Sequence, residues 1–356
     1  MDVKKHTIYM LGPSIATKGG ISSVLAFYQE QLIDKCDVRF IATYSGESRV
    51  LDFLLFGISV LRVLCIASFN KYSAFHIHAA TGGSFLRKSI LEWIVTRFHR
   101  TCILHIHGAD YEVFIDSAAP GLKKRIMWFL DHADAIVVLS QSWRNIFNRY
   151  ADDAKIHVIG NPARTIIDSI KTADPSLPLR LVFTGLIGNR KGAYDIVKAL
   201  SELKGRDWIL DIYGNGEVSQ MKQYIAELGL MKQVTVYDWV KHSELIKRYP
   251  EYQVQLLPSR AEGQPMSLLE GMGSGLALVA SSVGGIPELL VDGCNGISVT
   301  PGNIAEIKTA IIHCIENRGD VERMRLNSLQ RAKDMFSGEV ITRKLFMLYR
   351  SLKLEL

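Results

Sequence analysis

Residues 252–282, YQVQLLPSRAEGQPMSLLEGMGSGLALVASS, contain the succession of elements that decides the fold. The apolar runs YQVQLLPS and LALVASS each predict a buried strand, and the segment between them predicts a short helix. Pro265 suits the first position of that helix, and Gly275 suits its end. A strand, a helix and a strand in this order indicate one parallel βαβ unit.

The same alternation of strands and helices continues through the rest of the chain. It predicts an α/β protein with two Rossmann-like, doubly wound domains facing across a cleft. We expect a first domain over residues 1–168, a linker over 169–180 where DSIKTADPSLPLR breaks the pattern, and a second domain over 181–335. Residues 336–356 predict a last helix that packs back on the first domain. The expected strands are HTIYMLG, DVRFIAT, AFHIHAA, TCILHIHGA, DAIVVLS and KIHVIG, then LRLVFTG, DWILDIYG, QVTVYDW, YQVQLLPS, LALVASS and GISVT.

The composition of the 356 residues is that of an ordinary folded protein, with 48% hydrophobic and 22% charged residues. An excess of 42 Lys+Arg over 36 Asp+Glu suits an anionic ligand or membrane surface, but no basic run interleaved with aromatic residues predicts nucleic-acid binding. Five scattered cysteines indicate a reducing compartment, and we expect no secretory signal in MDVKKHTIYMLG.

The apolar segment LDFLLFGISVLRVLCIASF, residues 51–69, is long enough to span a membrane. Asp52 and Arg62 interrupt it, and a charge in mid-span is costly. The segment therefore predicts a buried or interfacial helix, and a helix lying on a bilayer stays open.

Two glutamates bracket the start of the helix in the opening segment. Glu262 lies in the loop beyond a strand end, and Glu270 lies more than one turn into the helix. The free N–H groups around Met266, Ser267 and Leu268 then favour an anion at the helix N-terminus. The spacing therefore predicts a nucleotide diphosphate between the two carboxylates, although a solvated and a capping glutamate would give the same pattern.

Three glycine-rich turns follow predicted strands. FTGLIGNRKG, residues 183–192, places Arg190 and Lys191 beside flexible backbone, which suits a phosphate clamp or a solvated basic turn. GPSIATKGGISSV, residues 12–24, lets Gly19 and Gly20 approach a ligand or simply form a turn. IYGNGE, residues 212–217, is a third such turn.

The tripeptide HIH occurs twice in predicted strands, and the alternation puts both histidines of each pair on one face. No carboxylate or thiolate with ligand spacing accompanies them, so we expect no metal and predict that His76, His78 and His105 are packed and hydrogen-bonded. His107 ends its strand and is predicted to point into the cleft.

The block PSRAEGQPMSLLEGMGSGLALVASSVGGIPELLVDGCNGISVTPG resembles the E-x7-E region of retaining glycosyltransferase family 4, which has the GT-B fold. KGGISSV, GLIGNRKG and GNGE occur in the family's order, and HIHAATGGSFLRKSI with ILHIHGAD resembles the branch that builds bacterial capsule, exopolysaccharide or O-antigen. The resemblance implies that Glu262, His107, Lys191 and Arg190 serve catalysis. It implies that the donor is bound by Gly19, Gly20, Gly188, Arg190, Lys191, Gly214, Glu262, Gly263, Met266, Ser267, Leu268 and Glu270.

In that assignment Glu270 holds the ribose, Glu262 contacts the donor sugar, and Arg190 and Lys191 neutralise the diphosphate. The chain departs from the family in carrying Leu186 where many members have an arginine, which we expect Arg190 to replace. It also has GQP at 263–265 instead of GFG, a difference that bears on sugar choice.

The expected activity is retaining, metal-independent transfer from a nucleotide-diphosphate sugar, without a cofactor, because no Asp-x-Asp occurs to hold a divalent ion. The acceptor is expected to bind the first domain and to be a lipid-linked glycan, so the protein is placed in the cytoplasm, peripheral to the inner membrane face. A GT-B-fold nucleotide-sugar epimerase and a non-catalytic sugar-nucleotide-binding scaffold are the alternatives.

Overall fold

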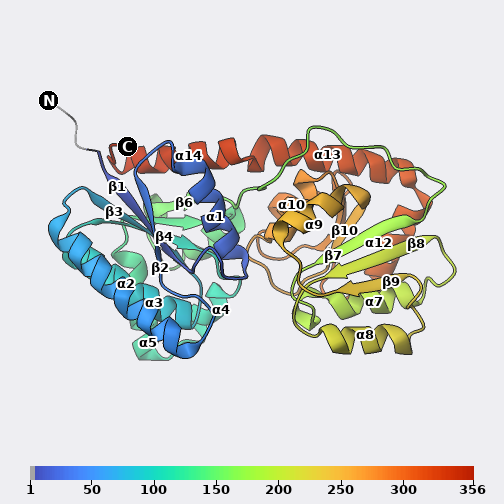
Figure 1. Ribbon diagram of the computed structural model, residues 1–356, viewed down its shortest axis with the longest axis horizontal. Helices are drawn as coiled ribbons and strands as arrows, with labels where there is room; N and C mark the ends of the chain where they lie inside the picture. Colours follow the sequence, from blue (N-terminus) through green and yellow to red (C-terminus); the bar gives the residue numbers. More distant parts are fainter. Residues whose placement is uncertain (1–4) are drawn as a thin grey trace. The chain divides into compact units, whose positions relative to one another are not determined.

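The computed structural model describes residues 5–356 and divides the chain into two compact units (Figure 1). One unit contains the chain up to Pro162 together with Gly338–Leu356, and the other contains Ala163–Ser337. Each unit is built on one parallel sheet of six strands.

The sheet of the first unit has the order β2-β1-β3-β4-β5-β6, with every pairing parallel. β1 and β3 are buried along their whole length, as expected of strands covered on both faces. The strands are β1 (Thr7–Gly12), β2 (Val38–Ala42), β3 (Ser73–Ala79), β4 (Thr101–Ile106), β5 (Ala135–Val138) and β6 (Ile156–Val158). The helices are α1 (Gly20–Leu32), α2 (Arg49–Phe69), α3 (Gly83–Arg97), α4 (Tyr111–Asp116), α5 (Pro120–Asp131), α6 (Gln141–Phe147) and α14 (Gly338–Ser351).

The sheet of the second unit has the order β12-β11-β10-β7-β8-β9 and is also parallel. Its strands are β7 (Leu179–Thr184), β8 (Trp208–Tyr213), β9 (Val234–Tyr237), β10 (Val254–Leu257), β11 (Ala277–Ser281) and β12 (Gly296–Val299). Its helices are α7 (Ala193–Ser201), α8 (Val218–Glu227), α9 (His242–Arg248), α10 (Met266–Gly273), α11 (Ile286–Leu289), α12 (Ile304–Glu316) and α13 (Arg318–Phe336). All twelve predicted strands are present, and the predicted α/β class with two Rossmann-like sheets is correct.

The division between the units differs from the predicted one. Residues 163–168, assigned to the first domain by sequence, belong to the second unit. There the Ala163 N–H donates to the carbonyl of Phe336 (2.8 Å), and the Ile167 N–H donates to that of Gly273 (2.9 Å). These backbone bonds join segments far apart in the chain, so the local pattern did not reveal them.

The last helix, α14, belongs to the first unit, where it contacts α1. It begins at Gly338 and not at 336, because Phe336 is still the end of α13. Tyr349 is fully buried, and its hydroxyl lies 2.8 Å from Nδ1 of His76 on β3. α14 therefore completes the core of the first unit from the far end of the sequence.

The segment at 51–69 lies within α2. Of the predicted buried or interfacial helix, the buried alternative is wrong, and the interfacial one stays a prediction. Of the residues of α2 only Ser59, Val63 and Ala67 are buried, and the rest of the helix carries a largely exposed apolar surface. By length and composition it is one helix, among the described residues, that could cross a membrane.

Candidate functional site

The topology of the second unit places two loops at one point of the sheet edge. From β7 the chain continues to β8 on one side, whereas β10 pairs with β7 on the other side. The loops beyond the carboxyl ends of β7 and β10 therefore meet where the strand order reverses, the usual ligand-binding position in such sheets. The Arg260 N–H donates to the carbonyl of Arg190 (2.9 Å) and joins them. Gly192 (φ 74°) lets them approach, because a Cβ there would lie 2.4 Å from the Pro258 oxygen.

The two loops bring Lys191 and Glu262 into an ion pair, 71 residues apart in sequence. The Lys191 ammonium donates to Oε1 of Glu262, and the Ser259 hydroxyl donates to the same oxygen (2.7 Å). The two side chains are only 14% and 6% exposed. Burial lowers the pKa of Lys191, while the Glu262 carboxylate acts in the opposite direction. The site thus holds a largely desolvated cation whose charge is compensated by one carboxylate.

A third loop fixes the backbone of Glu262 and Gly263. Gly284 adopts a left-handed conformation (φ 54°), and a Cβ at that position would lie 1.7 Å from the Glu262 carbonyl oxygen. The Gly285 N–H donates to the carbonyl of Gly263 (2.6 Å). Glycine at 284 is therefore required by both its conformation and this close approach.

The helix that follows, α10, begins at Met266, and Pro265 is its N-cap and not its first helical residue as predicted. No side chain caps this end. Met266 is 9% exposed and Ser267 is half-buried, but Leu268 is fully buried. Of the three residues expected to present N–H groups to an anion, Leu268 therefore has no exposed surface.

Glu270 lies one turn further along α10 and is 7% exposed. Its Oε1 is 3.0 Å from Nε2 of His242, an ion-pair distance, although the geometry does not satisfy a hydrogen bond. His242 begins α9 and was not predicted as a site residue. Nothing in KHSEL marks it, because only the fold brings α9 to α10.

The remaining predicted residues of the second unit have different surroundings. Arg190 is exposed, and its guanidinium donates to the Ala261 carbonyl at 3.4 Å. At Gly214 a Cβ would lie 1.8 Å from the Gly185 carbonyl oxygen, so this glycine is needed for packing between two loops. Gly188 is buried, and a Cβ there would lie 3.4 Å from Oε1 of Glu217.

Gly19, Gly20 and His107 lie in the first unit. Gly19 (φ 152°) precedes α1, and a Cβ there would meet no atom within 4 Å, so its surroundings are open. His107 is half-buried, and its Nε2 lies 2.9 Å from Nδ1 of His78.

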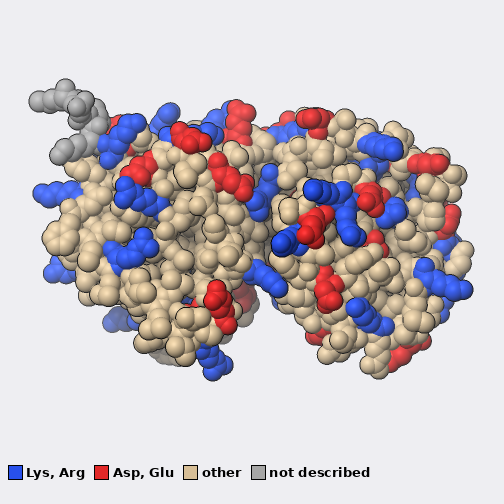
Figure 2. Space-filling model, viewed as in Figure 1, with Lys and Arg blue, Asp and Glu red and all other residues tan. Residues whose placement is uncertain are grey.

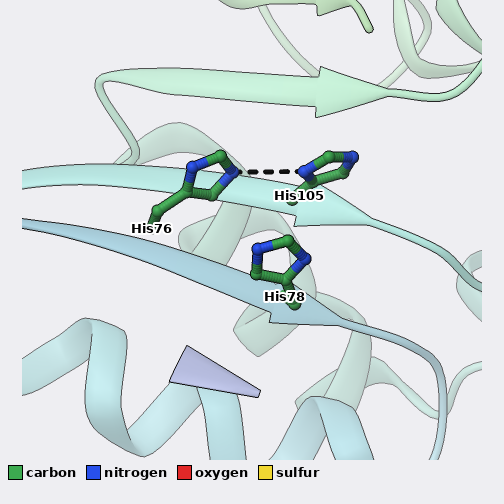
Figure 3. Close-up of side chains that lie close together, drawn as sticks. All are labelled: His76, His78 and His105. Atoms are coloured by element: carbon green, nitrogen blue, oxygen red, sulfur yellow. Dashed lines mark hydrogen bonds between the residues drawn. The ribbon is translucent and has the colours of Figure 1, made fainter. Parts of the chain in front are cut away.

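The histidines of β3 and β4 form a stack on one face of the sheet (Figure 3). His76, His78 and His105 are fully buried, and Nε2 of His76 is 3.2 Å from Nδ1 of His105. The prediction that these three are packed and hydrogen-bonded is confirmed, except that Nε2 of His78 and of His105 have no partner. Burial lowers the pKa of all three.

The same three histidines could offer a metal ion one nitrogen each, all within 4.8 Å of one another. Their ring planes differ by only 17° to 27°, however, so the in-plane lone pairs run side by side and do not converge. Two of the nitrogens also bond to each other. The geometry favours a stack of neutral imidazoles.

Comparison with known proteins shows what this arrangement resembles. Residues 178–317 match the family described as Glycosyl transferases group 1. The glycogen synthase of Mycobacterium tuberculosis is 21% identical over 244 residues, covering 64% of this chain and 56% of that protein. The lipopolysaccharide 1,6-galactosyltransferase of Escherichia coli K12 is 27% identical over 189 residues, covering 51% of this chain and 52% of that protein. The chain thus spans about half the length of the curated relatives it matches.

Solved structures resemble the whole chain. Sucrose-phosphate synthase of Thermosynechococcus elongatus superimposes with a TM-score of 0.79 at 16% identity, covering 98% of this chain and 99% of that one. Alr3699/HepE of Anabaena, solved in complex with UDP, superimposes with a TM-score of 0.76 at 18% identity, covering 97% of this chain and 100% of that one. The chain therefore has the GT-B fold that these structures share, and residues 178–317 match the model of the family described as Glycosyl transferases group 1.

Proposed function

We propose that the protein is a glycosyltransferase that takes a sugar from a nucleotide diphosphate. The observation that carries this proposal is the site at the β7–β10 reversal, where the buried Lys191–Glu262 ion pair lies in the loops that lead to the uncapped N-terminus of α10, the helix that carries Glu270. All of it lies within the group 1 domain at 178–317. The UDP bound to Alr3699/HepE supports a nucleotide as the ligand.

We assign the donor's diphosphate to Lys191 and the start of α10, its ribose to Glu270 and its sugar to Glu262. A phosphate reaching Lys191 can replace one partner of the ion pair, so the ammonium stays paired throughout. Of the helix N-terminal residues, Met266 and Ser267 keep exposed surface. Arg190, exposed beside this loop, supplies a further cation.

The proposed reaction retains the configuration of the sugar. A hydroxyl oxygen of the acceptor bonds to the anomeric carbon on the face from which the phosphate oxygen departs. The bond between that carbon and the phosphate oxygen breaks, and the hydroxyl proton passes to the leaving phosphate. Charge develops on the diphosphate, where Lys191 and the α10 N-terminus stabilise it without a metal. The Glu262 carboxylate faces the positive charge of the sugar.

Release of nucleotide diphosphate from UDP-, GDP- and TDP-sugars, in EDTA, tests this proposal. We expect release from one donor class when a lipid-linked glycan acceptor is added, and an axial product linkage from an axial donor by NMR. Turnover of the donor without an acceptor and with an altered sugar would favour the epimerase. Binding without any turnover would favour the scaffold.

We further propose that the acceptor is a lipid-linked glycan of a bacterial surface polysaccharide and that the protein is cytoplasmic and peripheral to the membrane. The support is an apolar surface on α2 and α3 of the first unit, which contact each other. Over α2 the space-filling view is mostly uncharged, with isolated basic groups (Figure 2). The α2–α3 surface contains the exposed residues Val50, Leu51, Phe53, Leu54, Ile58, Leu61, Leu64, Phe69, Leu86, Ile90 and Trp93.

Vesicle flotation measures this association. The protein is expected to float with vesicles containing anionic lipid, because Arg49 and Arg62 are exposed on α2 while its one acid, Asp52, accepts the N–H groups of Ser45 and Gly46. The double variant Phe53→Ser/Ile58→Ser should stay in the soluble fraction while keeping donor binding. Equal flotation of the variant and the wild type would exclude this surface.

A further inference from the structure

The first unit has a cavity of about 290 Å³ at the carboxyl edge of its sheet. Pro13, Tyr44 and Ala80, which line it, come directly or closely after β1, β2 and β3. β1 lies between β2 and β3, so the strand order reverses here as it does in the second unit. The cavity therefore occupies the ligand-binding position of this sheet.

Lys88 of α3 reaches this cavity and is 1% exposed. Its ammonium donates to the hydroxyl of Thr43, which in turn donates to the carbonyl of Gly12 (3.0 Å). Among residues 5–356 no carboxylate lies within ion-pair distance of Lys88. Burial and the charge of Arg87 lower the pKa of Lys88 to about 7. A buried ammonium without an anion is costly, so its place at a cavity indicates an anionic ligand.

Further donors surround the same cavity. Arg87 lines it beside Tyr44, with the guanidinium carbon 4.9 Å from the ring centre, and its Nε has no hydrogen-bond partner. α1 begins at Gly20 and α3 at Gly83, and neither N-terminus has a side-chain cap. Two cations and a helix N-terminus together suit a phosphate more than a carboxylate, because phosphate accepts more hydrogen bonds.

We propose that this cavity binds a phosphate or diphosphate group. Two sources share this chemistry, the diphosphate of a lipid-linked acceptor and that of the nucleotide donor, to which the family resemblance assigned Gly19 and Gly20, two residues that also line this cavity. α3 favours the acceptor: Arg87 and Lys88 line the cavity, while Leu86, Ile90 and Trp93 of the same helix are exposed on the α2–α3 surface. One helix thus offers cations for the phosphate and apolar side chains for the lipid. The assignment of this phosphate to the acceptor rests on the proposed function, whereas the binding of a phosphate group by the cavity does not.

Calorimetric titration of the full chain with pyrophosphate, farnesyl diphosphate and UDP tests the proposal. We expect Lys88→Met to weaken the binding of pyrophosphate and of farnesyl diphosphate by more than about tenfold and to leave the affinity for UDP unchanged. Its melting temperature should equal or exceed that of the wild type, because a buried charge is removed. Arg87→Gln, at a half-buried position, gives the same test if Lys88→Met fails to fold. Lys124→Gln, an exposed lysine on α5, is the control for charge.

The outcomes separate the two sources and the two proposals. Equal weakening of UDP would support the phosphate site and assign it to the donor. Absence of pyrophosphate and farnesyl diphosphate binding, or affinities unchanged in both variants, would overturn it. If UDP binding depends on Glu270 while substitution of Lys88 changes the affinity for none of the three ligands, the proposed function stands and the phosphate site is overturned. If farnesyl diphosphate binding depends on Lys88 and no nucleotide binds, the phosphate site stands and the proposed function is overturned.

Discussion

Replacing Lys191 by methionine is expected to lower the rate of sugar transfer by about two to three orders of magnitude. The methionine keeps most of the length of the side chain but removes the cation that is proposed to face the leaving diphosphate. Since this charge acts on the transition state more than on the bound donor, kcat should fall more than KM rises. Steady-state kinetics of Lys191→Met and of Lys198→Met, an exposed lysine on α7, measure the effect. A Lys191→Met enzyme with more than about a tenth of the wild-type rate would contradict this role.

The same variant should also lose stability, because the Glu262 carboxylate would stay buried with only the Ser259 hydroxyl as a partner. Breaking a buried ion pair from one side typically costs about 3 kcal/mol or more. Lys191→Met/Glu262→Gln removes both charges and should recover most of this loss in urea unfolding, yet stay inactive. Recovery of stability without activity separates the structural effect of the pair from its chemical one.

Replacing Glu270 by alanine is expected to raise KM for the donor by about 100-fold with little change in kcat. Two ribose hydroxyls bonded to a carboxylate contribute about 1.5 kcal/mol or more each, which together correspond to this factor. These bonds are the same in the bound donor and in the transition state, so the loss appears as weaker binding. Glu244→Ala, at an exposed position on the neighbouring helix α9, should behave as wild type. A fall in kcat with unchanged KM would place Glu270 in the chemistry instead.

The fold could be predicted from the sequence because buried parallel strands leave a local signal. Runs such as TIYMLG and ALVAS are apolar apart from one terminal hydroxyl residue each, and both are buried throughout. The exposure of α2 could not be predicted, since apolar composition indicates burial and does not show whether a partner element covers the helix. The contacts of residues 163–168 with α10 and α13 also depend on segments far apart in sequence.

The site could be predicted as far as its loops. Glycine turns beyond strand ends indicated the position of Lys191 and Glu262, but their ion pair joins two strands that neighbour each other only in the folded sheet. His242, which lies at ion-pair distance from Glu270, belongs to α9, and no sequence pattern around it indicates this contact. Lys88 was not singled out, because a lysine is ordinarily solvated and only the fold shows this one buried.

Calorimetric titration of UDP, GDP and TDP into wild type and Glu270→Ala, in EDTA, tests whether the β7–β10 reversal binds a nucleotide diphosphate. We predict that one nucleotide binds the wild type without a divalent ion and that Glu270→Ala binds it about 100-fold more weakly. Failure of every nucleotide to bind the folded wild type, or equal affinity in the variant, would contradict it.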